Sequence, residues 1–386
     1  GKNIEKVLNE EYEVSDNNSS YLVNSSLDLP FTEYTKLFNG CIEKFRPYIK
    51  CVKFGKYSNH YQLLEVSRVF FQLSKLSISN TKISLMAFQK ALSNLKYLKS
   101  FSMHGVSFLH YNGDPESIKP IILPNTLKHL DWQSCKVLHT VVEEDPQSAS
   151  FDYFGSESVH SMFQFQPDYF SKLKLYSSYL LDEYPFNMEI LRLNPQLTYL
   201  KLWIGEFNET SVSIISLIHN VKNLELYVDR LNFNLKIINF SLPNLTCLRF
   251  YRAELRVWPL IEKLALSSPN LSELRIEIGI YTDPNIIELV NNLPNLKKLA
   301  IQSYFDINPN FEDFRPGPKF EYLELHVQLN VHPILNKLAQ YPNFKAVIFN
   351  KSFFELSSLL IQDQENTAPP WKLINTQKFI KYYKLS

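Results

Sequence analysis

A single apolar pattern recurs along most of the chain at a nearly constant interval. Each copy reads apolar, two variable residues, apolar, one variable residue, apolar, as in Leu197-x-x-Leu200-x-Leu202. The last apolar position falls at residues 29, 54, 78, 103, 132, 175, 202, 226, 250, 276, 301, 325 and 349. Successive positions differ by 24–29 residues, apart from one step of 43 between 132 and 175. A nearly constant interval between copies over this length of chain predicts a repeat architecture.

Each repeat predicts one short strand and one helix. The alternation at the end of the pattern is typical of a strand with one buried face. The residues between strands have helical periodicity, as in Leu85, Phe88 and Leu92. A Pro-Asn turn such as Pro294-Asn295 precedes several strands, because the proline ring ends the preceding helix. One strand–helix unit cannot bury its own apolar side, so we expect the units to stack around a continuous core.

The composition narrows the classes of protein further. Only 9 glycines among 386 residues argue against Gly-rich phosphate loops and against turn-heavy barrels or propellers. The 40 Lys+Arg and 39 Asp+Glu leave a net charge of +1, so no chain-wide field favours nucleic acid or an anionic membrane. No stretch approaches 18 apolar residues, which argues against a membrane span. The 4 cysteines lack CxxC spacing, which favours reduced thiols over a disulfide scaffold.

Over residues 24–350 the pattern resembles the leucine-rich repeat family. The resemblance implies a single-domain α/β solenoid of about 13 irregular repeats of 24–27 residues, with parallel strands on the concave face and helices on the convex face. The Asn or Cys usual after the motif is found only occasionally, at Asn80 and Cys135. Divergent repeats rich in Phe, Tyr, Ile and Asn resemble those of fungal F-box proteins. The segment Ser26–Pro30 resembles the junction between an F-box and its first strand, although residues 1–20 carry no F-box pattern.

Three segments differ from the repeats. We expect residues 1–23 to form an acidic linker or cap before the leucine-rich-repeat domain at 24–365. Within the 43-residue step, residues 139–168 form an acidic insertion, which we interpret as a solvated surface loop that could be removed without unfolding the protein. The alternative is an arm that folds over the concave face or holds a partner. The basic, aromatic segment 366–386 is either a cap over the end of the core or a free binding tail.

The chain shows none of the common catalytic or metal-binding motifs. It contains no GxGxxG, GxxxxGK[ST], GxSxG or HExxH sequence. The histidine pairs His104/His110 and His326/His332 are six residues apart, which is not a metal-binding spacing on one helix face. We therefore expect no enzyme activity, no metal and no cofactor.

The candidate site is a surface on the predicted concave face. Residues that alternate with the core positions of each strand should point to that face. By this reading four consecutive repeats carry large aromatic rings in one file, with basic residues beside them, a composition that marks binding hot spots. The alternative is that the rings reflect strand propensity alone. The candidate partner-binding residues are Lys172, Lys174, Tyr176, Tyr199, Lys201, Trp203, Tyr227, Arg249, Tyr251 and Arg275.

The resemblance implies a protein-binding module, the substrate-recognition domain of an SCF-type (Skp1–cullin–F-box) ubiquitin ligase. Its partners would be an acidic or phosphorylated protein target on the concave face, and Skp1 through an F-box that this sequence does not contain. One alternative is a scaffold or inhibitor that binds a protein in its concavity without ligase function. A weaker alternative is a subunit of a nucleic-acid-associated complex. We expect an intracellular protein of the nucleus or cytoplasm, without membrane contact.

Overall fold

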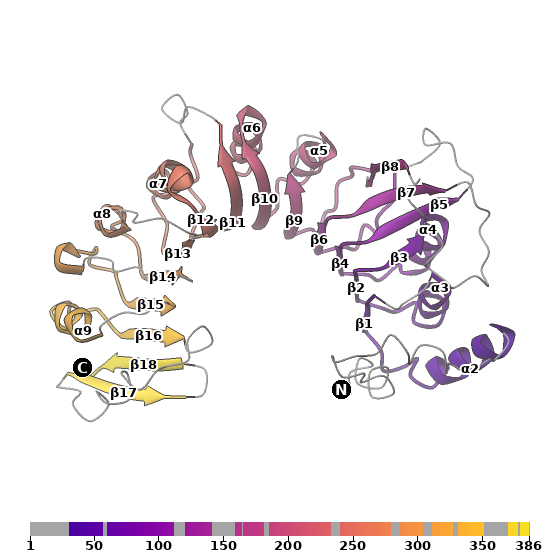
Figure 1. Ribbon diagram of the computed structural model, residues 1–386, viewed down its shortest axis with the longest axis horizontal. Helices are drawn as coiled ribbons and strands as arrows, with labels where there is room; N and C mark the ends of the chain where they lie inside the picture. Colours follow the sequence, from indigo (N-terminus) through magenta and orange to yellow (C-terminus); the bar gives the residue numbers. More distant parts are fainter. Residues whose placement is uncertain are drawn as a thin grey trace. The chain divides into compact units, whose positions relative to one another are not determined.

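The computed structural model divides the chain into two compact units, which are described separately (Figure 1). Unit 1 comprises Gly1–Ser177 and Tyr184–Asn194, and unit 2 comprises Ser178–Glu183 and Pro195–Ser386. The structure describes residues 31–56, 60–111, 120–140, 159–163, 165–180, 185–232, 240–278, 286–303, 311–326, 331–350, 370–376 and 379–385. The half-repeat at 27–29 and the linker at 1–23 therefore lie outside the described residues.

Unit 1 is built on a row of parallel strands, one for each repeat. Their order is β1, β2, β4, β6 and then β9, which ends in unit 2. The motif positions pair in phase, since Leu76 lies opposite Phe101 and Phe101 opposite Leu130. The strands are β1 (Cys51–Phe54), β2 (Lys75–Ser79), β4 (Ser100–His104), β6 (His129–Gln133) and β9 (Leu175–Leu180). The helices are α2 (Phe31–Glu43), α3 (His60–Val69), α4 (Leu85–Asn94) and α5 (Pro185–Leu193).

A second, smaller sheet covers unit 1 on the side where only helices were expected. Its order is β3-β5-β7-β8, and in Figure 1 it lies on the same side of the main strands as α3 and α4. Strands β2, β4 and β6 each turn into it through a residue with positive φ, namely Asn80, Gly105 and Ser134. At Gly105, where φ is +63°, a Cβ atom would lie 2.7 Å from the Asn80 Oδ1 atom, so a larger residue would be strained and would displace the Asn80 amide. The strands are β3 (Lys82–Ser84), β5 (Ser107–Tyr111), β7 (Lys136–Thr140) and β8 (Val159–Met162).

The described end of the predicted insertion belongs to the core of unit 1. Strand β8 pairs antiparallel with β7, and Phe163 and Phe165 are 0% and 1% exposed. The Phe163 ring lies 4.5 Å from Phe108 and 6.1 Å from Trp132 between centroids. The prediction of a removable loop over 139–168 is therefore wrong for these residues, because their apolar side chains complete the second layer. Residues 141–158 lie outside the described part of the chain.

Unit 2 repeats one strand and one helical segment in a more regular way. Its strands are neighbours in the order β10 to β16, all parallel, and Figure 1 places α6, α7, α8 and α9 on one side of them. The strands are β10 (Tyr199–Phe207), β11 (Asn223–Leu231), β12 (Cys247–Ala253), β13 (Glu273–Ile278), β14 (Lys298–Ser303), β15 (Tyr322–His326) and β16 (Ala346–Asn350). The helices are α6 (Glu209–Leu217), η5 (Leu255–Val257), α7 (Trp258–Leu266), α8 (Ile286–Asn291), η6 (Phe311–Asp313) and α9 (Val331–Ala339).

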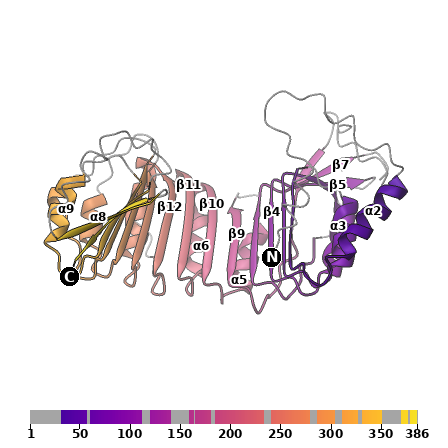
Figure 2. The same ribbon diagram turned by 90° about the horizontal axis from the view of Figure 1, so that it is seen from below.

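The motif leucines of unit 2 form the core, as the sequence predicts. Leu200, Leu224 and Leu248 lie opposite one another on adjacent strands and are 0% exposed. This register, parallel pairing and one-sided cover of helical segments confirm the α/β leucine-rich-repeat solenoid as the fold. The face of the sheet away from the helices is called the open face below, and Figure 2 shows the strands of unit 2 lengthwise.

The turns before the strands of unit 2 are linked by asparagine side chains. In each case the side-chain amide donates to a main-chain carbonyl of the preceding repeat, at 2.7–3.0 Å. The donors are Asn220, Asn244, Asn270, Asn295 and Asn343. The asparagine of the Pro-Asn turn therefore satisfies backbone acceptors that the strand ladder leaves open.

The described C-terminal residues form an antiparallel hairpin against β16. Strand β18 (Phe379–Lys384) pairs with β16, and β17 (Trp371–Asn375) pairs with β18. Tyr382 and Ile380 are buried, and the Lys384 ammonium donates to two main-chain carbonyls at the end of α9, each at 2.8 Å. The last parallel strand of unit 2 is thus covered by residues from the predicted tail.

Candidate partner-binding surface

The structure brings seven of the ten candidate residues together on the open face of β10–β13. Lys201, Trp203, Tyr227, Arg249 and their neighbours occupy adjacent strands in direct register. Each is partly exposed. The seven are Tyr199, Lys201, Trp203, Tyr227, Arg249, Tyr251 and Arg275.

Tyr176 is buried, so its predicted exposure is wrong. Its ring is 0% exposed, and its hydroxyl donates to Asn187 and accepts a hydrogen bond of 3.2 Å from the Trp132 indole. Tyr176 lies opposite Leu130, which places it in the core row instead of the open row. The segment Phe170-x-x-Leu173-x-Leu175 imitates the apolar pattern three residues too early, and this shifted the expected register.

Lys172 and Lys174 are exposed in unit 1, at the turn before β9. The Lys174 amide donates to the Lys128 carbonyl at 2.8 Å, so Lys174 precedes the paired part of its strand. Neither lysine lies in the row of Lys201. The structure therefore does not place these two residues beside the aromatic cluster of unit 2.

Three rings form a stacked cluster on β10, β11 and β12, called the ring cluster here. The Trp203 ring lies 4.6 Å from the Tyr227 ring at 28°, and 6.4 Å from the Tyr251 ring at 9°. Stacked rings of this size expose a flat apolar surface and lose little side-chain entropy when a ligand covers them. The ring cluster can therefore hold an apolar group of a partner.

Two cations lie against the ring cluster. The Lys201 ammonium is 5.5 Å from the Trp203 ring centroid and 5.4 Å from that of Tyr251. The Arg249 guanidinium lies 4.5 Å from the Tyr251 centroid. Among the described residues, Lys201 has no carboxylate within 4.0 Å. Its charge is balanced here by aromatic faces alone and can bind an acidic group.

Glu225 lies on this surface as its strand position predicts, but its hydrogen-bonding role was not apparent from the sequence. Its two carboxylate oxygens accept hydrogen bonds from the Tyr199 hydroxyl at 2.5 Å and the Tyr251 hydroxyl at 2.6 Å. Burial, followed by these bonds to Glu225, raises the pKa of both tyrosines, so both remain neutral donors. The Arg249 Nη1 atom is 3.8 Å from the same carboxylate, a weaker contact that leaves Arg249 open to a second acid.

A backbone irregularity in β12 adjoins the ring cluster. The pairing of β12 with β13 shifts between Phe250 and Ala253, and Arg252 has φ +48°. A non-glycine residue with positive φ is uncommon, and bulges of this kind re-aim side chains near functional sites. The Arg252 guanidinium lies 5.8 Å from the Tyr227 centroid, so it extends the charged margin of the cluster.

Arg275 is less available to bind a partner than its sequence position suggested, because it is already paired with a carboxylate. Its Nε atom lies 2.6 Å from a Glu273 carboxylate oxygen, and Lys298 bridges toward Glu324 at 2.7 Å. These pairs neutralise the β13–β15 side of the open face. The open positive charge is thus concentrated at Lys201 and Arg249.

The Glu324 network predicts an acid-sensitive stability. A hydrogen bond with His326, followed by the ammonium of Lys298, lowers the pKa of Glu324 from 4.5 to about 2. A carboxylate with a lowered pKa in the folded state stabilises the protein above pH 4.5, and this contribution is lost as the pH falls toward 2. We expect the free energy of unfolding to lose about 1–2 kcal/mol across this window, and Glu324→Gln to lack that component. Urea unfolding at several pH values measures it.

The matched control for this pH effect is Glu321→Gln. Glu321 pairs with Lys345 at 2.8 Å on the same part of the sheet, where the lysine side chain is 55% exposed. We expect this variant to keep the acid dependence of the wild type. Parallel pH profiles for wild type and Glu324→Gln would contradict the assignment.

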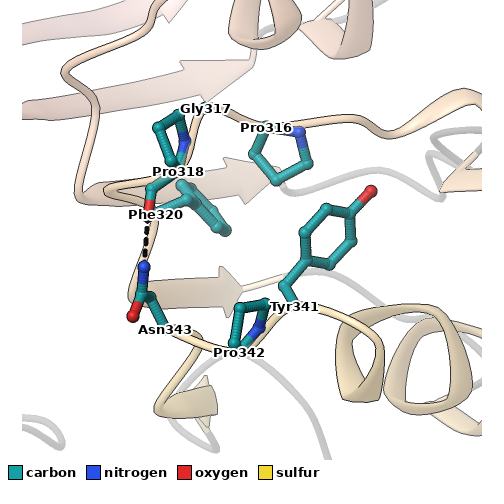
Figure 3. Close-up of a pocket in the computed structure, with 7 residues that line it drawn as sticks. All are labelled: Pro316, Gly317, Pro318, Phe320, Tyr341, Pro342 and Asn343. Atoms are coloured by element: carbon teal, nitrogen blue, oxygen red, sulfur yellow. Dashed lines mark hydrogen bonds between the residues drawn. The ribbon is translucent and has the colours of Figure 1, made fainter.

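A separate pocket of about 330 Å³ lies at the turns of unit 2 (Figure 3). Pro316, Pro318, Phe320, Tyr341 and Pro342 line it, and the Asn343 amide closes one side with its bond to the Pro318 carbonyl. None of the lining residues is charged. Tyr341 is the one ionisable residue of this lining; burial raises its pKa, and its hydroxyl donates to the Phe314 carbonyl at 2.7 Å.

The residues that the structure describes include no group of three His, Cys, Asp or Glu side chains that could hold a metal ion. They also include no helix that is long and apolar enough to cross a membrane.

Comparisons with known proteins add little to this description. No family model matches the chain, and no curated protein matches its sequence. Among solved structures, an internalin (inlF) from Listeria monocytogenes is similar at 15% identity, with a TM-score of 0.34, over 79% of this chain and 82% of the internalin chain. At this TM-score the likeness carries no argument, and the fold assignment rests on the strand register and helix placement given above.

Proposed function

We propose that the protein is a protein-binding module that holds its partner on the open face of β10–β12. The observation that carries the proposal is the ring cluster of Trp203, Tyr227 and Tyr251 with Lys201 against two of its rings. The rings provide apolar area, and Lys201 and Arg249 provide charge for an acidic or phosphorylated group. Glu225 holds Tyr199 and Tyr251 in place, so the surface is formed before the partner arrives.

The partner proposed for this surface is a peptide segment with an apolar anchor beside an acidic group. Glu225 and Glu277 interrupt the positive field, which favours mixed charge over a uniform phosphate backbone at this face. The apolar anchor supplies affinity, and the acidic group orients the segment.

The test is a bead-bound peptide library with a fixed Ser, Glu or phosphoserine among random positions. We expect the full chain to select peptides with an aromatic or aliphatic residue near the Glu or phosphoserine. Trp203→Ala should weaken the best peptide by about 2 kcal/mol, or about 30-fold, because a stacked interface ring is lost. Arg249→Glu should weaken it with a salt-dependent component.

The matched control is Tyr322→Ala, which removes a tyrosine from the open face of β15, away from the ring cluster. It should leave the affinity for the selected peptide unchanged. If no peptide is selected, or if Trp203→Ala selects the same peptides with equal affinity, the ring cluster is not a binding surface.

We propose further that this module is the substrate receptor of an SCF-type ubiquitin ligase in the nucleus or cytoplasm. The proposal is supported by the resemblance of the divergent repeats to fungal F-box proteins and by the Ser26–Pro30 segment. Co-expression of the natural full-length protein with Skp1, followed by size-exclusion chromatography, tests it. A stable equimolar complex is expected. Its absence would favour the scaffold or inhibitor alternative, while the peptide experiment would stand independently.

A further inference from the structure

The strand starts of unit 1 carry a row of lysines that the proposed peptide surface does not use. Each of the five main strands contributes one lysine, and we call this row the lysine edge. Its members are Lys50, Lys75, Lys99, Lys128 and Lys174, all exposed.

Main-chain hydrogen bonds hold Lys99, Lys128 and Lys174 in direct register, whereas Lys75 lies one residue further along its strand, opposite Ser100. The Lys75 amide donates to the Lys50 carbonyl at 3.0 Å, and the Lys128 amide donates to the Lys99 carbonyl at 2.8 Å. The Lys174 amide donates to the Lys128 carbonyl at 2.8 Å. Neighbouring strands lie about 4.8 Å apart, so the row places five cations along roughly 19 Å.

The Lys50 ammonium donates to the Gln72 side chain at 2.7 Å, and three other lysines of the edge make no ion pair with a described residue. Lys75, Lys99 and Lys128 make no ion pair with the residues that the structure describes, and the same holds for Lys96 and Lys172 beside the row. Partial burial and then the charges of Lys128, Lys75 and Lys174 lower the pKa of His129, which lies among them. The lysine edge therefore carries a local positive field, although the whole chain is nearly neutral.

The corresponding positions of unit 2 show that the fold does not require this charge. There the equivalent row is Thr198, Lys222, Thr246, Ser272, Lys297, Glu321 and Lys345, and Lys345 is paired with Glu321 at 2.8 Å. The same backbone ladder forms with neutral residues at Thr198, Thr246 and Ser272. The ladder therefore does not account for the lysines on three adjacent repeats of unit 1, Lys99, Lys128 and Lys174.

Exposed tyrosine rings accompany the lysines. Tyr48 is 78% exposed and Tyr97 is 59% exposed, and each lies two residues before a lysine of the row, across one buried residue. Tyr169, 55% exposed, lies at the turn that leads to Lys174. The rings of Tyr48 and Tyr97 contact no other ring or cation among the described residues. Asp168, whose carboxylate accepts a hydrogen bond from the Tyr169 amide, is the acid next to this turn.

We propose that the lysine edge binds single-stranded nucleic acid, with lysines on the phosphates and Tyr48 and Tyr97 stacked on bases. A row of point charges follows a phosphate backbone without reading its sequence, and aromatic rings accept any base. An anionic bilayer or an acidic protein segment would match the same charge, and the experiment below separates these ligands from nucleic acid. The expectation of no nucleic acid came from the whole-chain charge and the open face, and neither describes this edge.

Fluorescence anisotropy of the full chain with labelled dT and rU oligonucleotides of about 12 residues tests the proposal. Five contacts predict that log K falls with log salt with a slope of about −3.5. The triple variant Lys75→Gln/Lys99→Gln/Lys128→Gln should bind at least about 10-fold more weakly and lower the slope by about 2. Tyr97→Ala should weaken binding at least about 5-fold with the slope unchanged, because it removes stacking and no charge.

The matched control is Lys222→Gln/Lys297→Gln, which removes two exposed lysines from the equivalent row of unit 2. It should keep full affinity, and thermal melts should show that all variants fold. The proposal is overturned if neither oligonucleotide binds, or if the control loses as much affinity as the triple variant. It is also overturned if polyglutamate or phosphatidylserine vesicles bind through the same lysines while Tyr97→Ala has no effect on the oligonucleotides.

Discussion

Replacing Phe163 by Ala is expected to lower the free energy of unfolding of unit 1 by about 3–5 kcal/mol. The ring is fully buried between the two sheets, 4.5 Å from Phe108 and 4.8 Å from Phe165 between centroids. Its removal leaves a cavity that these neighbours can fill only in part. Urea unfolding monitored by circular dichroism measures the loss.

Met86→Ala is the matched control, since Met86 on α4 is 66% exposed although it lies beside the same core. Its unfolding free energy should change by less than about 0.5 kcal/mol. If Phe163→Ala were as stable as this control, residues 159–165 would lie outside the core, as the sequence had suggested, and the insertion would be removable.

Deleting residues 370–386 is expected to make the protein aggregate at concentrations at which the intact chain remains monodisperse. We propose that the hairpin caps the array, because Tyr382 lies opposite Val347, and the Trp371 ring lies 5.9 Å from Phe344. Its loss opens an unpaired strand edge and the apolar core behind it. Light scattering and size-exclusion chromatography measure the change.

Lys372→Ala provides the control for charge, since Lys372 is exposed on the outer strand of the hairpin. This variant should remain monodisperse and as stable as the wild type. A monodisperse and equally stable deletion variant would instead show that the segment is a free tail, and its lysines would then become candidates for binding.

The strand positions of both units could be predicted from the sequence because they depend on one strong signal. A leucine in the core row cannot shift by one residue without moving the whole strand to the other face. The register of the strands that contain Leu200, Leu226 and Leu274 could therefore be predicted from these leucines alone. The prediction was wrong at Tyr176. This tyrosine is hydrogen-bonded in the core, but a tyrosine was not expected at a core position, and the apolar Leu175 beside it completed a false copy of the motif.

The second sheet of unit 1 could not be predicted in the same way. Its strands β3 and β8 have only three and four residues, too short for a clear period, and β7 and β8 both lie inside the 43-residue step, where the repeat gives no register. The sequence around Phe163 does not indicate that its ring is buried. Its contact with Phe108 arises only when β8 pairs with β7 in the folded protein.

The candidate site was predicted in outline but not in its chemistry. The file of Trp203, Tyr227 and Tyr251 follows from strand register, and the structure brings these rings together. The role of Glu225 depends on the reach of two tyrosine side chains from neighbouring strands, which spacing does not encode. The positive φ of Arg252 likewise has no sequence signal, because no glycine marks it.

The asparagine links between turns bear on how such an array can change in length. Each link ties a turn to the repeat before it, so an insertion between two turns has to be absorbed on the helical side of its own repeat. The strands then keep their relative heights, and the ring cluster keeps its spacing. Related sequences that gain or lose residues in the helical segments would thus keep the geometry of the ring cluster, even where their sequences no longer align with one another.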